Sequence, residues 1–182
     1  YMVVGKYVSF RSIKIEDASL LCRWYRNKEL MKHVGFEDGL NVTEEGLIFS
    51  IANEAADKSE DRAFRRFIII ENCTGNAIGE LSFNDLDLVN KCCEIGIKIC
   101  EIEKQHRGYG YEALRLFLKY LFNTYNLHRI ELDTLVENKR AQGLYKKAGF
   151  NEIGVKRDCW LDPQGNYRSA VLMDILKDEY NR

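Results

Sequence analysis

Proline, histidine and paired cysteines are scarce in this sequence. It contains one proline and three histidines among 182 residues, and its six cysteines include no C-x-x-C pair. A zinc site is therefore not expected. A disulfide framework is not expected either, because a chain of this length can fill a hydrophobic core without one. We expect no metal ion and six reduced thiols: Cys22, Cys73, Cys92, Cys93, Cys100 and Cys159.

Net charge and long apolar runs are also lacking. The formal net charge is -1, so no overall field attracts the protein to nucleic acid or to an anionic membrane. No secretory signal pattern and no apolar run long enough to span a bilayer is visible. We therefore expect a cytoplasmic protein with neither a nucleic-acid nor a membrane partner.

Length and composition favour one well-filled domain over residues 1–182. A hydrophobic fraction of 46% and a charged fraction of 30% are ordinary for a soluble globular protein. A chain of 182 residues is long enough for one buried core and short for two.

The hydrophobic pattern predicts alternating strands and helices. Alternation of apolar and polar residues predicts strands at 8–15, 67–71, 77–83, 94–100, 129–136, 151–160 and 167–177. Helical spacing predicts helices at 18–28, 43–56 and 139–148, and a long one after Gly110 that continues to Tyr125. Asp17, Thr43 and Asn138 are the expected N-caps. This order predicts an α/β (α+β) fold, with a mixed central sheet of about seven strands and helices on both faces.

A glycine-bearing turn joins the fourth predicted strand to the long helix. Its residues run from Gln105 to Gly110, with the letters QHRGYG. Gly108 and Gly110 can adopt backbone angles closed to other residues, so several N–H groups can point at one small anion. The helix dipole adds to this preference for a phosphate or pyrophosphate, and Lys104 and Arg107 add charge. On local pattern alone, the turn is also compatible with a simple connection between a strand and a helix that binds no ligand.

Two common phosphate loops are excluded. No G-x-x-x-x-G-K-S/T sequence occurs, and Ala113 stands where the strict G-x-G-x-x-G pattern has its third glycine. The turn also comes past the middle of the chain, whereas a dinucleotide fingerprint belongs to the opening βαβ unit.

The chain resembles the GNAT acetyltransferases, the Gcn5-related N-acetyltransferase superfamily. The main motif of that family, Q/R-x-x-G-x-G/A, is matched by the turn from Gln105 to Gly110. A second motif, Asn-x-x-Ser/Ala followed by Tyr and closing on Gly-Phe, is matched from Asn138 through Ala141 and Tyr145 to Phe150. The stretch from Gly165 to Met173 is similar to the branch that holds ribosomal-protein and spermidine N-acetyltransferases.

The resemblance implies acetyl-CoA as the cosubstrate and a sheet whose fourth and fifth strands splay apart. The pantetheine arm would lie along the backbone of Ile97, Lys98 and Ile99, with Gly96 helping the splay, and Asn138 would bond the arm or adjacent backbone. The pyrophosphate would bind N–H groups from His106 to Tyr111. The implied cradle consists of Gln105, His106, Arg107, Gly108, Tyr109, Gly110 and Tyr111.

The reaction implied is direct attack of a neutral primary amine on the thioester, without an acyl-enzyme. Tyr145 is the candidate general acid for the departing thiolate, with its hydroxyl reaching the cleft from beside a buried stripe formed by Leu144 and Ala148. The alternative is a boundary tyrosine that only packs its ring. Ala141 stands where some relatives have a serine, so a serine-assisted step is absent and Tyr145 becomes the stronger candidate for the acid.

Glu94, at the start of the fourth strand, is the family match for the general base, acting through a chain of water. The alternative is an ordinary strand-end charge. The nearby thiols of Cys92, Cys93 and Cys100 are poor candidates for a nucleophile, because no histidine is close in sequence and the family does not use one. A backbone N–H near Ile99 is the simplest oxyanion donor.

The acceptor amine is the least determined part of the reaction. A polyamine, a peptide N-terminus and an aminoglycoside-like molecule are all compatible with the family. In this branch the first two helices and the loop after the third strand wall the amine pocket. The side chains offered there are Trp24, Tyr25, Glu37, Asp38, Glu44, Glu45, Asp85 and Asp87, which are otherwise solvated surface or, for Trp24, core.

The leading hypothesis is therefore an acetyl-CoA-dependent N-acetyltransferase, an acyltransferase acting on a primary amine. The alternatives are a non-catalytic acyl-CoA-binding regulator and a partner-binding domain with an empty cleft. A homodimer is expected from family habit.

Overall fold

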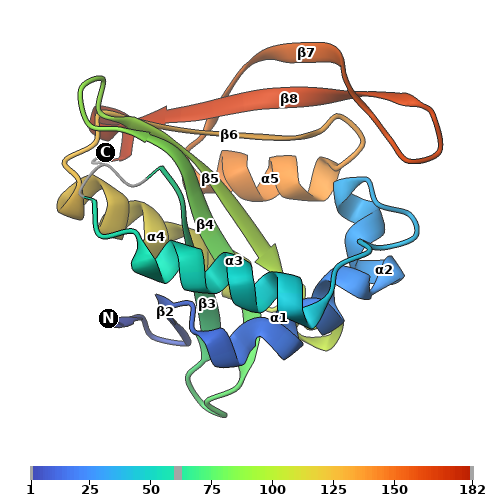
Figure 1. Cartoon of the computed structure of the whole chain (residues 1–182). Helices are drawn as coiled ribbons and strands as arrows, with labels where there is room; N and C mark the ends of the chain where they lie inside the picture. Colours follow the sequence, from blue (N-terminus) through green and yellow to red (C-terminus); the bar gives the residue numbers. More distant parts are fainter. Residues whose placement is uncertain (1, 60–62, 181–182) are drawn as a thin grey trace.

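The computed structural model describes residues 2–59 and 63–180. All strands in these ranges belong to one mixed sheet, in the order β1-β2-β3-β4-β5-β6-β8-β7 (Figure 1). The strands are β1 (Met2–Val4), β2 (Val8–Ser12), β3 (Arg65–Glu71), β4 (Ala77–Asp87), β5 (Cys92–Ile99), β6 (Arg129–Leu135), β7 (Asn151–Leu161) and β8 (Tyr167–Leu176). The seven predicted strands are confirmed as elements, and the short edge strand β1 is additional.

The helices lie where the apolar spacing predicts them, with shifted ends. They are α1 (Ala18–Arg26), α2 (Lys28–Met31), α3 (Glu44–Ala56), α4 (Tyr109–Thr124), α5 (Lys139–Ala148) and α6 (Lys177–Tyr180). Short 3-10 turns precede or follow some of them, at Ile15–Asp17, Lys32–Val34 and Ile102–Lys104. The first predicted helix divides in two because the Asn27 side chain accepts a hydrogen bond from the N–H of Leu30 and so starts α2.

Helices cover both faces of the sheet, as predicted. Phe67 of β3 packs with Phe117 of α4, while its neighbour Ile68 packs in the cluster that holds α1 and α3. Successive strand residues point to opposite faces, so α4 lies on one face and α1 and α3 on the other. The α5 residue Ala148 belongs to the α4 cluster.

Two of the three predicted N-caps are confirmed. Thr43 accepts from the N–H of Gly46 at 3.1 Å, and Asn138 accepts from the N–H of Ala141 at 3.2 Å. The prediction for Asp17 is wrong. The chain already turns in the 3-10 segment before α1, and the Asp17 carboxylate instead accepts a two-pronged hydrogen bond from Arg11 and one from the N–H of Lys14.

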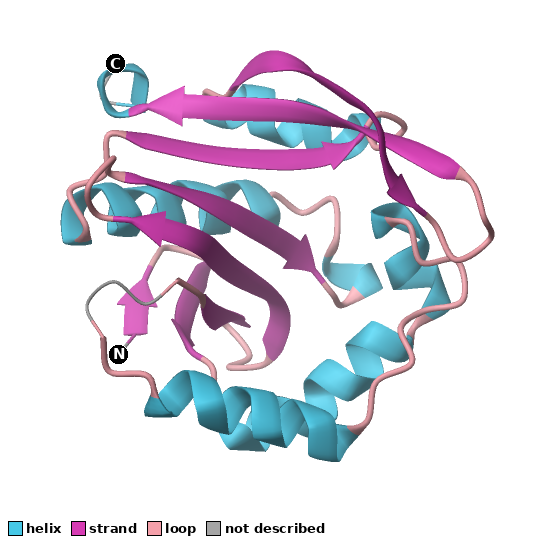
Figure 2. Ribbon diagram, turned by 45° about the horizontal axis from the view of Figure 1, so that its top comes forward, coloured by secondary structure: helices cyan, strands magenta, loops and turns pink. Residues whose placement is uncertain are grey.

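The sheet splays between β5 and β6, the parallel pair at its centre. Within the described residues they pair at Cys92 with Arg129, Cys93 with Ile130 and Glu94 with Glu131. Beyond Glu94, β5 continues to pair with β4 as far as Ile99 but no longer with β6. The two strands diverge visibly in Figure 2, which confirms the predicted splay.

Candidate active site

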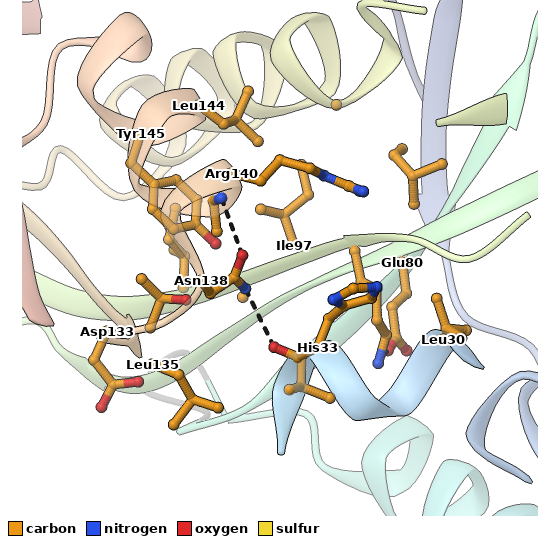
Figure 3. Close-up of a pocket in the computed structure, with 18 of the residues that line it drawn as sticks. Leu30, His33, Glu80, Ile97, Asp133, Leu135, Asn138, Arg140, Leu144 and Tyr145 are labelled. Carbon is orange, nitrogen blue, oxygen red and sulfur yellow. Dashed lines mark hydrogen bonds and ion pairs between the residues drawn. The ribbon is translucent and has the colours of Figure 1, made fainter. Parts of the chain in front are cut away.

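A cleft of about 1230 Å³ opens where β5 and β6 separate. Its walls come from β4, β5 and β6, from α5, from the segment around α2, and from the β7–β8 hairpin. Figure 3 shows Tyr145, Asn138 and Asp133 on one side of this cleft and Leu30, His33 and Glu80 on another. Segments from the beginning, middle and end of the chain therefore meet at one site.

The predicted cradle forms one end of the cleft. Gly108 has a φ of +84° and caps α4 without a side-chain hydrogen bond, and His106 has a φ of +60°. The first bond into the helix runs from the N–H of Glu112 to the carbonyl of Gly108. The N–H groups in the first turn of α4, from Tyr109 to Tyr111, therefore have no acceptor within the helix, as an anion-binding helix start requires.

Gly110 differs from the sequence expectation. It lies inside the first turn of α4 and has no positive φ, so His106 rather than Gly110 supplies the second unusual backbone angle. A Cβ at Gly110 would lie 3.6 Å from Ile99 and 3.7 Å from Leu144, and both side chains line the cleft. The missing side chain therefore leaves space inside the cleft.

Arg140, in the first turn of α5, joins that helix to the cradle. Its guanidinium donates to the Gln105 side-chain carbonyl at 2.8 Å and lies 3.4 Å from a ring nitrogen of His106. The Gln105 amide in turn donates to the carbonyl of Ile99 at 2.9 Å. Arg140 lies within the second motif, but its contact with the cradle depends on folding and was not found from the sequence.

The buried Glu71 supports the cradle through hydrogen bonds from Lys104 and Tyr109. Its carboxylate, 1% exposed, accepts hydrogen bonds from the Lys104 ammonium at 2.8 and 2.9 Å and from the Tyr109 hydroxyl at 2.7 Å. Hydrogen bonds from Lys104, Thr74 and Tyr109 lower the pKa of Glu71 to about 2. Lys104 lines the cleft as expected, but its charge is paired with Glu71. Arg107 is exposed and does not line the cleft.

Tyr145 reaches the cleft from α5, as Figure 3 shows. The side chain is only 7% exposed, and its ring packs on Phe150. Burial, and to a lesser degree the charge of Asp133, raises the pKa of Tyr145 to about 12. Among the described residues the Tyr145 hydroxyl has no hydrogen-bond partner. Every fully buried polar side-chain atom in these residues does have a partner. The Tyr145 hydroxyl is therefore not fully buried and opens to the cleft.

The buried stripe of α5 is offset from the prediction. Tyr145 and Ala148 are buried, whereas Leu144 is partly exposed and lines the cleft. Leu144 therefore occupies the cleft-side position that was predicted for Tyr145. The ring of Tyr145 packs in the core, and its hydroxyl faces the cleft.

Glu94 lies next to the cleft but does not line it. It pairs across the sheet with Asn84 on β4 and Glu131 on β6, at the last paired position before the splay. Burial, followed by the charges of Asp133, Asp85 and Glu131, raises the pKa of Glu94. This is the direction that favours a proton acceptor near neutral pH, but any proton must reach Glu94 from the cleft through an intermediate.

The exposed edge of β5 forms the floor of the cleft. Ile97, Lys98 and Ile99 all line it, as does Gly96. The ammonium of Lys98 pairs with Glu80 at 2.9 Å, and the hydroxyl of Tyr25 donates to the same carboxylate at 2.6 Å. The side chain of Lys98 is therefore held by the protein, while its backbone is not paired to β6.

Of the residues considered for the acceptor pocket, most take the alternative position, as surface charge or core. Tyr25 lines the cleft, whereas Trp24 is buried and donates to Glu101, and none of the predicted carboxylates lines the cleft. Asp38 pairs with Lys28, and Asp87 binds N–H groups of its own turn. The carboxylates that do line the cleft are Glu80, Asp133 and Glu137.

Sequence alternation could have pointed to Asp133. It stands on the charged face of β6, which would be solvated surface in a continuous sheet. Where β6 diverges from β5, the same face becomes a wall of the cleft. The predicted splay therefore implied that Asp133 faces a cleft, although Asp133 was not among the predicted site residues.

Comparison with known proteins identifies the family. The family model described as an acetyltransferase (GNAT) domain matches residues 8–151. This chain belongs to the GNAT acetyltransferase family. The spermidine N(1)-acetyltransferase of Vibrio cholerae is 32% identical over 66% of this chain and 68% of that protein. The Bacillus subtilis YjcK protein, described as a probable N-acetyltransferase, is 38% identical over 86% of this chain and 87% of its own length.

A solved structure shares the whole fold of this GNAT chain. It is the spermidine N-acetyltransferase from Vibrio cholerae in complex with CoA and spermine, with a TM-score of 0.85 and 25% identity over 98% of this chain and all of that one. The GNAT chain is therefore an enzyme that transfers an acetyl group from acetyl-CoA to a primary amine. The free N–H groups at the start of α4 fit the pyrophosphate of that cosubstrate.

Two further findings concern the described residues alone. They contain no group of three histidine, cysteine, aspartate or glutamate side chains arranged to hold a metal ion. None of their helices is both long and apolar enough to cross a membrane.

Proposed function

We propose that this enzyme acetylates a polyamine, a small acceptor that carries further positive charge beside the reacting amine. The observation that carries the proposal is Asp133, a carboxylate that lines the cleft and whose charge acts on both Tyr145 and Glu94. Asp85, Glu94 and Asp133 form no ion pair with any described residue, and their mutual repulsion contributes to the raised pKa of Glu94. Unpaired like charges are unfavourable together, and a bound ammonium relieves that cost.

The relatives support the same class of acceptor. The Vibrio cholerae protein is named for spermidine, and its solved structure is titled as a complex with CoA and spermine. A neutral or anionic acceptor would leave the Asp133 carboxylate without a counter-charge. A peptide N-terminus carries its charge on the reacting amine, which must become neutral to attack, so that group brings no ammonium for Asp133.

The proposed acetyl-CoA site uses the cradle and the free edge of β5. The N–H groups from His106 to Tyr111 would hold the pyrophosphate, with Gln105 and Arg107 beside them. The backbone of Ile97, Lys98 and Ile99 would pair with the pantetheine arm, since that edge has no strand partner. Asn138 would support this site by capping α5.

The proposed chemistry divides two proton transfers between two residues. An alkyl ammonium with a pKa of about 10.4 must lose a proton before it can attack, and Glu94 would accept that proton through water. Tyr145 would donate a proton to the departing thiolate. The raised pKa of the Tyr145 phenol keeps its proton in place at neutral pH, so it is available to be given.

We expect a cytoplasmic, single-domain enzyme that forms a homodimer, a state that light scattering would test. The competing function is a non-catalytic acyl-CoA-binding regulator. The accessible hydroxyl of Tyr145 beside Asp133 favours catalysis over that alternative, because a regulator needs no proton donor there.

The test is thiol release from acetyl-CoA with a panel of amines. Spermidine, spermine, an aminoglycoside and short peptides with free N-termini cover the three acceptor classes. The proposal expects turnover on the polyamines at the highest kcat/KM. Preferential turnover of peptides would replace the polyamine, and CoA binding without thiol release on any amine would favour the regulator.

A further inference from the structure

The strand β7 carries a bulge directly before Trp160. Lys156 pairs with Ala170 and Trp160 pairs with Arg168, so three residues of β7 oppose the single residue Ser169 of β8. Asp158 within the bulge has a φ of +47°, and its N–H donates to the Ser169 hydroxyl at 3.0 Å. Bulges of this kind bend a strand and re-aim its side chains. Figure 2 shows the end of β7 crossing over β8.

The re-aimed Trp160 packs on the segment that follows α2. Its ring lies 5.2 Å from the ring of Phe36, measured between centroids. Gly35 passes so close that a Cβ there would clash with the indole, and its φ of +96° is itself a glycine conformation. The absence of a side chain at Gly35 therefore leaves room for the indole, and glycine also permits the positive φ.

The segment held by Trp160 is a wall of the cleft. The turn Lys32–Val34 immediately precedes Gly35, and all three of its residues line the cleft. The Asn138 side chain donates to the carbonyl of His33 at 3.3 Å, so α5 holds the same turn from another direction (Figure 3). Trp160 itself also lines the cleft, beside Lys156 and Arg168.

This wall lies away from the acetyl-CoA cradle. The cradle starts α4, which covers one face of the sheet, whereas the turn Lys32–Val34 follows α1 and α2 on the other face. The side chains of β4 and β5 that face this wall include Glu80 and Lys98, which the cradle does not use. An acceptor amine that meets the thioester in the splay is therefore bounded on its far side by Trp160 and the turn it supports.

We infer that Trp160 is a specificity-determining residue that limits how far an acceptor can extend beyond its reacting nitrogen. The inference rests on the proposed function only for placing the amine on this face of the sheet. The bulge of β7 sets the direction of the indole, and the contacts with Gly35 and Phe36 fix it. Removal of the indole leaves space beside the cleft and releases the turn Lys32–Val34.

The kinetic test compares Trp160→Ala with Trp160→Phe and wild type. Each is assayed at saturating acetyl-CoA with two series of linear amines of increasing length, monoamines and α,ω-diamines. In Trp160→Ala, the ratio of kcat/KM for the longest to the shortest amine should rise about tenfold or more, as when a pocket wall is removed. Trp160→Phe, which retains a ring, should change this ratio less, and the KM for acetyl-CoA should stay within about twofold in both. An unchanged length ranking in Trp160→Ala would overturn the inference.

The two amine series separate this inference from the proposed function. If wild type uses monoamines as well as diamines, the proposal of a charged acceptor fails, but the length ranking is still measured. Phe36→Ala removes the partner of Trp160 from the other side and should shift the ranking in the same direction. It serves as the second variant if Trp160→Ala does not fold.

A measurement without any amine tests the structural part. The N–H groups of Gly35 and Phe36 donate to the carbonyls of Lys32 and Met31, so their hydrogen exchange reports opening of this segment. Exchange at these two amides should be at least about tenfold faster in Trp160→Ala than in wild type, with β3 and β4 unchanged. Equal exchange would show that Trp160 does not hold the wall.

Discussion

Tyr145 on α5 and Asp133 on β6 line the same side of the cleft, and the Asp133 carboxylate adds to the effect of burial in raising the pKa of the Tyr145 phenol. The phenol thus combines a buried ring, a hydroxyl without a partner among the described residues, and an acidic neighbour. These properties suit a proton donor that stays protonated until its acceptor is present.

The first prediction concerns the Tyr145 hydroxyl. Tyr145→Phe keeps the ring that packs on Phe150 and removes only the proton donor. We expect kcat to fall about ten- to a thousandfold, the range for losing a positioned acid, with little change in the affinity for CoA. Steady-state kinetics and calorimetry with CoA measure the two quantities. Unchanged turnover would remove Tyr145 from the mechanism.

The second prediction concerns the pH dependence of activity. Glu94 must be ionised to accept a proton, and its raised pKa places the acidic limb of the kcat/KM profile above the ordinary value for a glutamate. Asp133→Asn removes one of the charges that raise this pKa, so the acidic limb should move to lower pH. Tyr145 has a pKa of about 12, so its ionisation should not limit activity at neutral pH.

The control for this profile is Glu45→Gln, which removes an exposed carboxylate that does not line the cleft. It should leave the acidic limb where it is. If Asp133→Asn and Glu45→Gln give the same profile as wild type, Asp133 does not act on the base.

The third prediction uses Gly110, whose missing side chain leaves room between Ile99 and Leu144. Gly110→Ala should weaken CoA binding, because the added methyl enters the cleft. The same change should raise helix stability by up to about 1 kcal/mol. Calorimetry with CoA and thermal unfolding separate the two effects.

Gly143→Ala is the matched control. This position also lies in a helix, is exposed, and has no heavy atom within 4 Å of the added Cβ. It should give a comparable gain in stability with unchanged CoA affinity. Equal affinity of both variants and wild type for CoA would contradict the placement of the ligand beside Gly110.

The fourth prediction concerns Glu71, which holds Lys104 and Tyr109 on either side of the cradle. Glu71→Gln removes the charge that both donors bind, so the KM for acetyl-CoA should rise while the KM for the amine changes little. Thr74→Val, which removes a hydroxyl that binds Glu71 from its own turn, should have a smaller effect on the KM for acetyl-CoA. An equal rise in both KM values would indicate a general loss of structure instead.

Glu71 also predicts a pH dependence of stability. Its pKa of about 2 in the folded protein lies below the ordinary glutamate value of 4.5, so the folded state binds the proton less readily than the unfolded state. The stabilisation is therefore present above pH 4.5 and is lost as the pH falls from there toward 2. The difference in unfolding midpoint between wild type and Glu71→Gln should shrink over that range in acid titrations followed by circular dichroism.

The sequence predicted the parts of this enzyme that depend on neighbours along the chain. The alternation of β6 and the cap at Asn138 are local patterns, and each is found where it was expected. The prediction for Asp17 failed because its partner, Arg11, competes with the helix that Asp17 was expected to cap. An aspartate before a helix can cap that helix or pair with a nearby cation, and the sequence pattern alone does not distinguish these two roles.

The acceptor side of the cleft could not be predicted because its residues come from distant segments. Asp133 becomes a cleft residue only where β6 separates from β5, and Trp160 reaches Gly35 only through a bulge in β7. Lys156, Arg157 and Asp158 break the alternation of apolar and polar residues, but such a break does not by itself specify a bulge. The cradle, in contrast, was found from one continuous motif.

The most direct test of the account is the rate of thiol release from acetyl-CoA with spermidine against a linear monoamine of the same backbone length. At low ionic strength, where charges are least screened, we expect a kcat/KM at least about tenfold higher for spermidine. In Asp133→Asn this preference should be smaller. Equal kcat/KM values for the two amines in wild type would contradict the proposed acceptor.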